Sequence, residues 1–212
     1  MDFRVVQCED TSCALRFPVT ALDKPPRRCP RCGGSLRTLY QAATAGDEHA
    51  PAQRNTLPLR VLVDNVRSAF NVGSILRSAD AAGAHEVILC GITPTPEHPR
   101  VARSALGAES SVRWSWAADA LAAAAVQREA GSTLWALEEG EGARSLHDVA
   151  LPAHGLTLVV GNEVVGVEPA LLALCECVVA LPMRGTKRSL NVAVACGAAL
   201  VLLGERMDKG SG

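Results

Sequence analysis

Aromatic side chains are the scarcest large class in this sequence. Only 3% of the 212 residues are Phe, Trp or Tyr, while hydrophobic residues as a whole make up 48%. That share is enough for a folded core, and with so few rings the core must be aliphatic and rich in alanine. The length suits one full α/β domain with a small appendage, at roughly 150 residues per domain.

A strong net charge of either sign is also missing. The formal charge is −1 and the pI about 6.5, which argues against an indiscriminate binder of polyanions. The charge is unevenly spread, because residues 1–40 contain seven Lys and Arg against four acids, a net +3 that leaves −4 for the rest. A basic appendage is compatible with an arm that positions RNA, and ordinary variation of surface charge is the alternative.

No stretch of the sequence is long and apolar enough to cross a bilayer. The longest, residues 190–204, is interrupted by Asn191 and falls short of the roughly 20 residues that a span needs. The first ten residues hold no apolar run behind a basic start, so we expect no signal peptide, a cytoplasmic location and no membrane partner. Cytoplasmic thiols stay reduced, and the eight cysteines therefore indicate metal ligands or buried thiols rather than disulfides.

The common nucleotide and hydrolase motifs are absent as well. The sequence GNEVVG at 161–166 has the glycine spacing of a phosphate loop but lacks the Lys-Ser/Thr that would follow. There is no G-x-G-x-x-G after a strand and no H-E-x-x-H. These absences argue against a nucleoside triphosphatase, a dinucleotide-dependent enzyme and a zinc hydrolase.

The chain divides into four segments by composition. Residues 1–40 are rich in Cys, Arg and Pro, residues 41–56 form a linker, residues 57–206 form the main domain, and residues 207–212 form a tail. We expect strands at 60–64, 86–90, 133–137, 157–161 and 177–181, and helices at 72–82, 119–130, 169–174 and 190–206. Strands that alternate with helices predict an α/β fold with a mainly parallel sheet and helices on both faces.

Four of the cysteines have the spacing of a structural zinc site. Cys8 and Cys13 are separated by four residues, and Cys29 and Cys32 stand in the sequence CPRCGG, typical of a zinc knuckle. The segment is too small to bury a core of its own, so bound metal would supply its folding energy. We therefore expect these four thiolates to bind one Zn²⁺ in a zinc ribbon, with reduced free thiols as the alternative.

A first motif, NVRSAFNVGSILRSA at 65–79, contains two polar side chains at the start of a predicted helix. Asn71 stands at the helix entrance, and a capping role is one interpretation. Arg77 has apolar neighbours in sequence, where an arginine is costly unless it is paired. A structural salt bridge to Asp80 or Glu163 is the alternative to a functional role for Arg77.

Two further motifs follow predicted strands directly. The segment 158–169 contains Gly161, which permits close backbone approach, and Glu163, which either serves a site or is a surface acid. The segment 184–203 leads from a basic loop through Ser189, Leu190 and Asn191 into an apolar helix, for which Ser189 is the expected cap. A plain helix cap is the alternative interpretation. Ligands of parallel sheets bind beyond the carboxyl ends of the strands, where all three motifs fall.

Taken together, the three motifs resemble those of the SpoU/TrmH class of RNA ribose 2′-O-methyltransferases, within the SPOUT superfamily. The resemblance covers roughly residues 57–205, and the motifs occur in the order and spacing of that class. It implies a C-terminal trefoil knot and a homodimer with the site near the subunit interface. It also implies S-adenosylmethionine (AdoMet) as the methyl donor, and it is compatible with a substrate-facing loop at residues 105–109.

The resemblance assigns roles to individual residues. Arg77 matches the catalytic arginine that acts at the ribose hydroxyl and its adjacent phosphate. The other implied catalytic-site residues are Asn71, Glu163, Ser189 and Asn191. Cofactor binding is implied for Gly161, Leu181, Met183 and Leu190.

The sequence is therefore interpreted as that of an enzyme that methylates a ribose 2′-hydroxyl in tRNA or rRNA, with RNA rather than DNA as the partner. A free arginine keeps its proton, so we expect Arg77 to clamp the substrate phosphate, with that phosphate or a water relaying the proton. The alternatives are a base methyltransferase on the same fold and a non-catalytic RNA-binding adaptor.

Overall fold

The computed structural model describes residues 2–20, 26–43, 57–186 and 189–209. The chain forms two compact units, Met1–Gln53 and Arg54–Gly212, each built around its own sheet. In the part of the chain that the structure describes, no helix is both long and apolar enough to cross a membrane.

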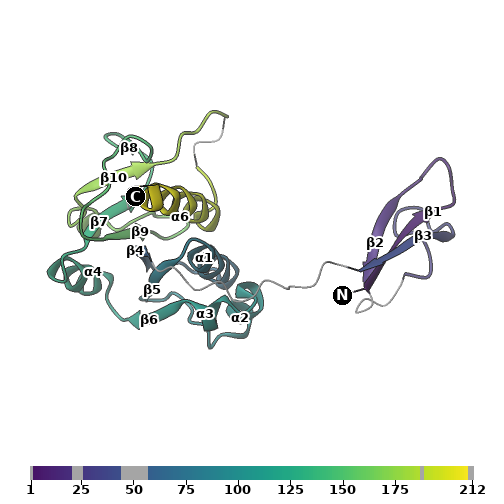
Figure 1. Cartoon of the computed structure of the whole chain (residues 1–212), viewed down its shortest axis with the longest axis horizontal. Helices are drawn as coiled ribbons and strands as arrows, with labels where there is room; N and C mark the ends of the chain where they lie inside the picture. Colours follow the sequence, from purple (N-terminus) through teal and green to yellow (C-terminus); the bar gives the residue numbers. More distant parts are fainter. Residues whose placement is uncertain (1, 21–25, 44–56, 187–188, 210–212) are drawn as a thin grey trace. The chain divides into compact units, whose positions relative to one another are not determined.

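The first unit is a three-stranded antiparallel sheet in which β1 (Asp2–Cys8) lies between β2 (Arg16–Thr20) and β3 (Leu36–Ala43) (Figure 1). Its buried apolar side chains are few, and Cys8 and Cys29 are among them. Strand β3 extends three residues into the segment that we expected to be linker, and residues 44–56 of that segment lie outside the described residues.

The second unit contains a seven-stranded sheet in the order β6-β5-β4-β9-β7-β10-β8, and all of its strand pairings are parallel. Its strands are β4 (Leu57–Asp64), β5 (Ala84–Cys90), β6 (Arg113–Ala117), β7 (Thr133–Leu137), β8 (Arg144–Ser145), β9 (Leu156–Val160) and β10 (Cys177–Ala180). Its helices are α1 (Ala69–Ala81), α2 (Pro99–Ala105), α3 (Ala108–Ser111), α4 (Ala120–Glu129), α5 (Pro169–Leu172) and α6 (Val192–Lys209).

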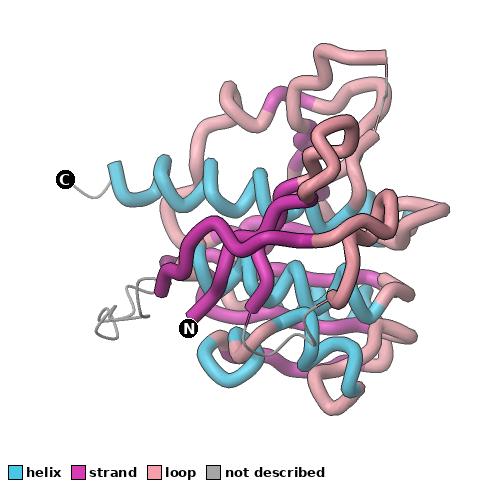
Figure 2. Tube along the Cα trace, turned by 90° about the vertical axis from the view of Figure 1, so that its right-hand side faces the viewer, coloured by secondary structure: helices cyan, strands magenta, loops and turns pink. Residues whose placement is uncertain are grey.

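Helices cover both faces of this sheet, as the sequence predicts. Successive side chains of a strand point to opposite faces, so Val61 and Val63 of β4 join the larger core with α1 and α6, while Leu62 joins a second core with α4 and α5. Helix α6 is the long helix that ends beside the C-terminus in Figure 2. It runs to Lys209, so the expected tail is helical for three residues more than predicted. The trefoil knot stays a prediction.

Candidate active site

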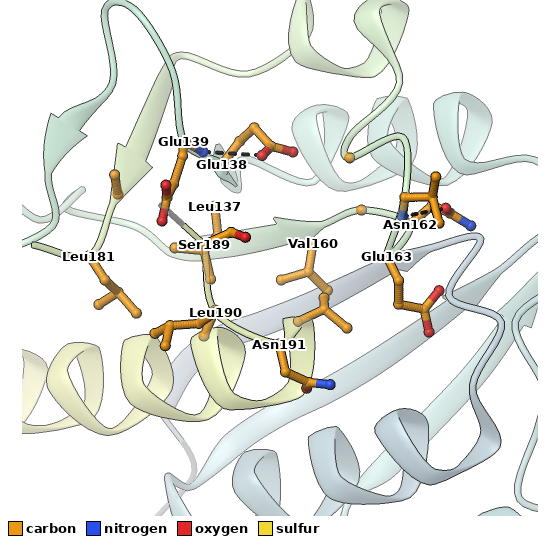
Figure 3. A pocket seen from close by; sticks show the side chains of 16 residues that line it. Leu137, Glu138, Glu139, Val160, Asn162, Glu163, Leu181, Ser189, Leu190 and Asn191 are labelled. Atoms are coloured by element: carbon orange, nitrogen blue, oxygen red, sulfur yellow. Dashed lines mark hydrogen bonds between the residues drawn. The ribbon is translucent and has the colours of Figure 1, made fainter. Parts of the chain in front are cut away.

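A cavity of about 390 Å³ lies beyond the carboxyl ends of three neighbouring strands, β7, β9 and β10, at the start of α6 (Figure 3). The carboxyl ends of parallel strands share one edge of the sheet, which is where the sequence predicts a ligand site. Its lining consists of Leu137, Glu138, Glu139, Val160 to Val164, Gly166, Ala180, Leu181, Ser189 to Val192 and Ala195.

One side of the cavity is apolar. Figure 3 shows the side chains of Leu137, Val160, Leu181 and Leu190 converging from the strand ends and from the residues before α6. Leu190 is 42% exposed although it is apolar, because the cavity leaves its side chain without a packed neighbour on that side. The cavity can therefore enclose a flat apolar group.

The loop from Gly161 to Gly166 closes tightly on itself. Asn162 and Gly166 exchange two backbone hydrogen bonds of 3.0 Å each, and the Asn162 Oδ1 accepts from the Val164 N–H at 2.9 Å. A Cβ atom added at Gly161 would overlap the backbone of Gly166 and Val167. Glycine is therefore required at residue 161 to let the two sides of the loop touch.

Glu138 holds this loop from the end of β7. Its Oε2 accepts a hydrogen bond from the Val167 N–H at 3.0 Å, and its carboxylate lies against Gly166, which has a φ of +73°. Glu138, Glu139 and Asn162 also line the cavity and were not predicted as site residues from the sequence. Glu138 directly follows a predicted strand, so the rule that ligands bind at carboxyl ends of strands could have indicated it.

Glu163 joins the second motif to the first. Its carboxylate accepts hydrogen bonds from the backbone N–H of Arg67 at 3.0 Å, from that of Ser68 at 2.9 Å and from Asn71 Nδ2 at 3.0 Å. Partial burial opposes ionisation, but these donors outweigh it and lower the pKa of Glu163 below its ordinary value. The Arg67 guanidinium lies 3.9 Å from the same carboxylate. Glu163 is an exposed residue, but these donors hold its ionised carboxylate in place and leave 19% of the side chain exposed.

Asn71 joins the first motif to the third. Its side-chain Oδ1 accepts from Asn191 Nδ2 at 3.1 Å while its Nδ2 donates to Glu163. The capping role expected of Asn71 is wrong: Ser68 caps α1, and its Oγ accepts from the Asn71 N–H at 3.3 Å. The residue is instead buried, with 7% of its surface exposed, as the middle link of a Glu163–Asn71–Asn191 chain.

The cap of α6 is Asn191 rather than Ser189. The Asn191 Oδ1 accepts from the backbone N–H of Ala193 at 2.9 Å and of Val194 at 3.4 Å. Ser189 lies two residues earlier, is exposed and lines the cavity. Asn191 thus both caps the helix and links to Asn71, so the plain-cap alternative does not account for it.

Three of the expected site residues, Asn71, Arg77 and Met183, do not line this cavity. Asn71 is joined to it by its hydrogen bonds to Glu163 and Asn191. Arg77 lies on α1 with an exposed side chain, so the expected burial among apolar neighbours is wrong, whereas Ile75 and Leu76 beside it are fully buried. Glu163, one of its two expected salt-bridge partners, lies against Arg67 instead. Met183 follows β10 and is half-buried outside the cavity.

The four N-terminal cysteines come together as the sequence predicts. The sulfur atoms of Cys8, Cys13, Cys29 and Cys32 all lie within 4.8 Å of one another. A tetrahedral zinc ion with Zn–S bonds of about 2.3 Å places its sulfurs about 3.8 Å apart. The Cys13–Cys29 sulfurs are 3.8 Å apart and the Cys8–Cys32 sulfurs 3.4 Å apart, so this donor set fits zinc.

The family model for the SpoU rRNA methylase family matches residues 58–201. A 23S rRNA (uridine(2479)-2′-O)-methyltransferase of Streptomyces viridochromogenes is 36% identical over 67% of this chain and 50% of its own length. The 23S rRNA (guanosine-2′-O-)-methyltransferase RlmB of Vibrio cholerae is 31% identical over 68% of this chain and 57% of its own. The chain thus spans about half the length of these two relatives.

Solved structures agree with the sequence comparison. The SpoU methyltransferase AviRb from Streptomyces viridochromogenes is 32% identical with a TM-score of 0.65, over 72% of this chain and 60% of its own. An AdoMet-bound rRNA methyltransferase from Sinorhizobium meliloti is 29% identical with a TM-score of 0.66, over 72% of this chain and 57% of its own. Two of the three motifs line the cavity, and Asn71 of the first is hydrogen-bonded to both. With the family match covering more than half of the chain, this protein belongs to the SpoU rRNA methylase family.

Proposed function

We propose that this protein transfers a methyl group from AdoMet to a ribose 2′-hydroxyl of tRNA or rRNA. The observation that carries the proposal is the Glu163–Asn71–Asn191 chain, which ties all three sequence motifs to one cavity. The relatives that the chain resembles are named as rRNA 2′-O-methyltransferases. Family membership and site construction therefore support the same reaction.

The cavity suits AdoMet in shape and charge. Its apolar side, with Leu181 and Leu190, can enclose an adenine, and Gly161 allows backbone groups to approach a ligand closely. Three carboxylates, those of Glu138, Glu139 and Glu163, lie in the lining, and its described residues include no Lys or Arg. These carboxylates favour a sulfonium ligand, which carries positive charge at the reacting centre. Met183 lies outside the cavity, so we assign it an indirect role in cofactor binding, through the loop that it shares with residues of the lining.

The protein's part in the reaction is positioning. AdoMet supplies an activated methyl group, and in-line attack by a hydroxyl then requires the two reactants to be held together in a dry site. The Glu163 carboxylate already accepts three hydrogen bonds from the first motif. We therefore assign it to positioning that motif rather than to proton removal. Ser189 and Asn191 line the cavity as polar groups. Arg77 would clamp the phosphate next to the target ribose bidentately, and that phosphate or a water would relay the proton.

A homodimer completes this site. Arg77 does not line the cavity of its own chain, while Val194 and Val201 of α6 leave 56% and 50% of their surface exposed, one above the other at a spacing of seven residues. Such an apolar stripe is suited to a subunit interface. We therefore assign Arg77 to the cavity of the partner subunit. A monomer in sedimentation at micromolar concentration would contradict this assignment.

The first unit would bind one structural zinc ion through its four cysteines and help to dock RNA, in keeping with its positive charge. Cytoplasmic location stays a prediction from the sequence. A base methyltransferase and a non-catalytic adaptor remain the alternatives, and the intact polar chain at the cavity argues against the adaptor.

Labelled AdoMet and total RNA from a strain lacking the gene test the proposal. We expect label to enter the RNA with the wild-type protein and not with Arg77→Ala, while calorimetry shows that both bind AdoMet. Absence of AdoMet binding by the wild-type protein would contradict the enzyme proposal and leave the adaptor.

A further inference from the structure

A second hollow, of about 540 Å³, is lined by Arg67 and Ser68, whose backbone N–H groups donate to Glu163 of the cavity lining. It is formed by the chain leading into α1, the loop after β5 and one face of α2. We call it the arginine groove and define it by its lining: Arg67, Ser68, Ala69, Phe70, Ile92, Pro94, His98, Arg100, Arg103 and Ser104.

The arginine groove is positive in a protein whose net charge is −1. Three arginines line it, and its lining contains no acidic side chain. Arg100 and Arg103 are exposed, and within the described ranges neither forms an ion pair. Arg67 keeps 59% of its side chain exposed while it lies near Glu163. Two unpaired guanidinium groups and a third that is mostly exposed, all around one hollow, favour a ligand that carries several phosphates.

The groove also presents an aromatic ring to solvent. Phe70 is 71% exposed and Ile92 is 66% exposed, in a sequence with only three Phe. A ring on the surface beside arginines is typical of proteins that bind single-stranded nucleic acid, since any base can stack on it. Inorganic phosphate has no base that could stack on this ring, so the ring favours a nucleic acid as the ligand.

The arginines are held on a fixed frame. A Cβ atom at Gly73 of α1 would overlap Ser104 Oγ and lie 2.7 Å from the Val101 carbonyl oxygen, so α2 packs directly on the backbone of α1. Ser104 Oγ also donates to the Ala69 carbonyl oxygen at 3.3 Å. The packing of α2 on α1 therefore fixes the positions of Arg100 and Arg103 relative to the start of α1.

We infer that the arginine groove binds the unpaired RNA nucleotides next to the target ribose, with phosphates at Arg67, Arg100 and Arg103 and one base stacked on Phe70. The inference rests on the proposed function, because it names where the RNA of that reaction lies. Glu163 then connects the two sites, because it lines the cofactor cavity and accepts hydrogen bonds from Arg67 and Ser68 of the groove.

The test measures binding of the full-length protein to a fluorescein-labelled single-stranded RNA of about twelve nucleotides at several salt concentrations. Arg100→Ala/Arg103→Ala should raise the Kd about tenfold or more. It should also reduce the slope of log K against log salt by about 1.4, because two phosphate contacts are lost. Arg113→Ala/Arg128→Ala, which removes two exposed arginines outside the groove, is the matched control and should keep the wild-type Kd and slope.

Phe70 gives an independent readout. Phe70→Ala should weaken binding about tenfold with an unchanged salt slope, because stacking releases no counterions, and Phe70→Trp should restore binding. Wild-type Kd and slope for the groove double variant, or an Arg113/Arg128 control that loses as much, would overturn the inference. AdoMet calorimetry separates the two proposals: a wild-type protein that does not bind AdoMet contradicts the proposed function, whereas a groove variant with normal RNA binding contradicts only the groove.

Discussion

At the scale of single residues, the site is built from side chains that each make several specified hydrogen bonds. Asn71 donates to Glu163 and accepts from Asn191, and Asn191 also caps α6. The Asn191 side chain thus serves both as a helix cap and as a polar group of the site. Substituting any member of the chain should disturb both geometry and stability, which makes conservative variants the informative ones.

Replacing Arg77 by lysine tests the clamp. Lysine keeps the positive charge but loses the planar fork that holds two phosphate oxygens at once. We expect Arg77→Lys to lower kcat/KM for RNA by about a hundredfold, with unchanged AdoMet affinity in calorimetry. Near-normal turnover would show that charge alone suffices and would discard the bidentate clamp.

The lowered pKa of Glu163 predicts a dependence of stability on pH. The folded protein favours the ionised carboxylate, so its contribution is complete above the ordinary pKa of 4.5 and is lost as the pH falls through the lower folded value. Thermal melting between pH 7 and pH 3 should show Glu163→Gln less stable than the wild type at neutral pH.

The melting temperatures of the wild type and Glu163→Gln should then converge as the pH falls and the wild-type carboxylate becomes protonated. Glu129→Gln, at an exposed position on α4, is the control and should follow the wild type throughout. A constant gap between the wild type and Glu163→Gln across this range would contradict the ionised hydrogen-bonded state.

At the scale of elements, periodicity and strand-end rules predicted the elements that frame the cavity. The strands at 60–64, 86–90, 133–137, 157–161 and 177–181 agree with the structure to within a few residues, because buried parallel strands are short continuous apolar runs. Strand β6, RWSWA, was missed because it lies at the sheet edge and alternates polar with aromatic residues. Helix α2 was missed because it has only seven residues and follows prolines.

The site was predictable where a motif follows a strand and not where contacts are long-range. Glu163 and Asn191 were singled out from sequence, but their link through Asn71 joins residues 92 and 120 positions apart. No local pattern reports such contacts. The same limit explains why Ser68 rather than Asn71 caps α1: both are good caps, and tertiary contacts decide between them.

The tight loop around Gly161 should not tolerate a side chain. Gly161→Ala would force its Cβ into the backbone of Gly166 and open the wall of the cavity. We expect AdoMet binding in calorimetry to be lost while far-ultraviolet circular dichroism stays close to that of the wild type. Gly185→Ala is the control, since no atom lies within 4 Å of the added Cβ there. Full AdoMet affinity of Gly161→Ala would place the cofactor elsewhere.

At the scale of the whole molecule, the two units contain different candidate sites. The four-cysteine cluster belongs to the first unit and the cavity and arginine groove to the second. The family match at 58–201 covers only the second, so the cysteine-rich unit is an addition to the matched part of the chain. Oligomeric state is the property of the whole molecule on which the placement of Arg77 depends.

Heterodimers test whether Arg77 acts across the interface. Arg77→Ala and Gly161→Ala chains, co-expressed with two different affinity tags and purified as the mixed dimer, contain one intact site only if Arg77 serves the partner's cavity. We expect about half of the wild-type turnover from the mixed dimer and almost none from either homodimer. An inactive mixed dimer would place Arg77 at the cavity of its own chain.

The central claim is methyl transfer to a ribose hydroxyl, and the chemistry of the labelled RNA tests it most directly. RNA labelled by the wild-type protein with AdoMet is hydrolysed in alkali and the products are separated. Cleavage requires a free 2′-hydroxyl, so the account predicts label in alkali-resistant dinucleotides and none with Arg77→Ala. Label recovered in mononucleotides would contradict it, because the methyl group would then be on a base.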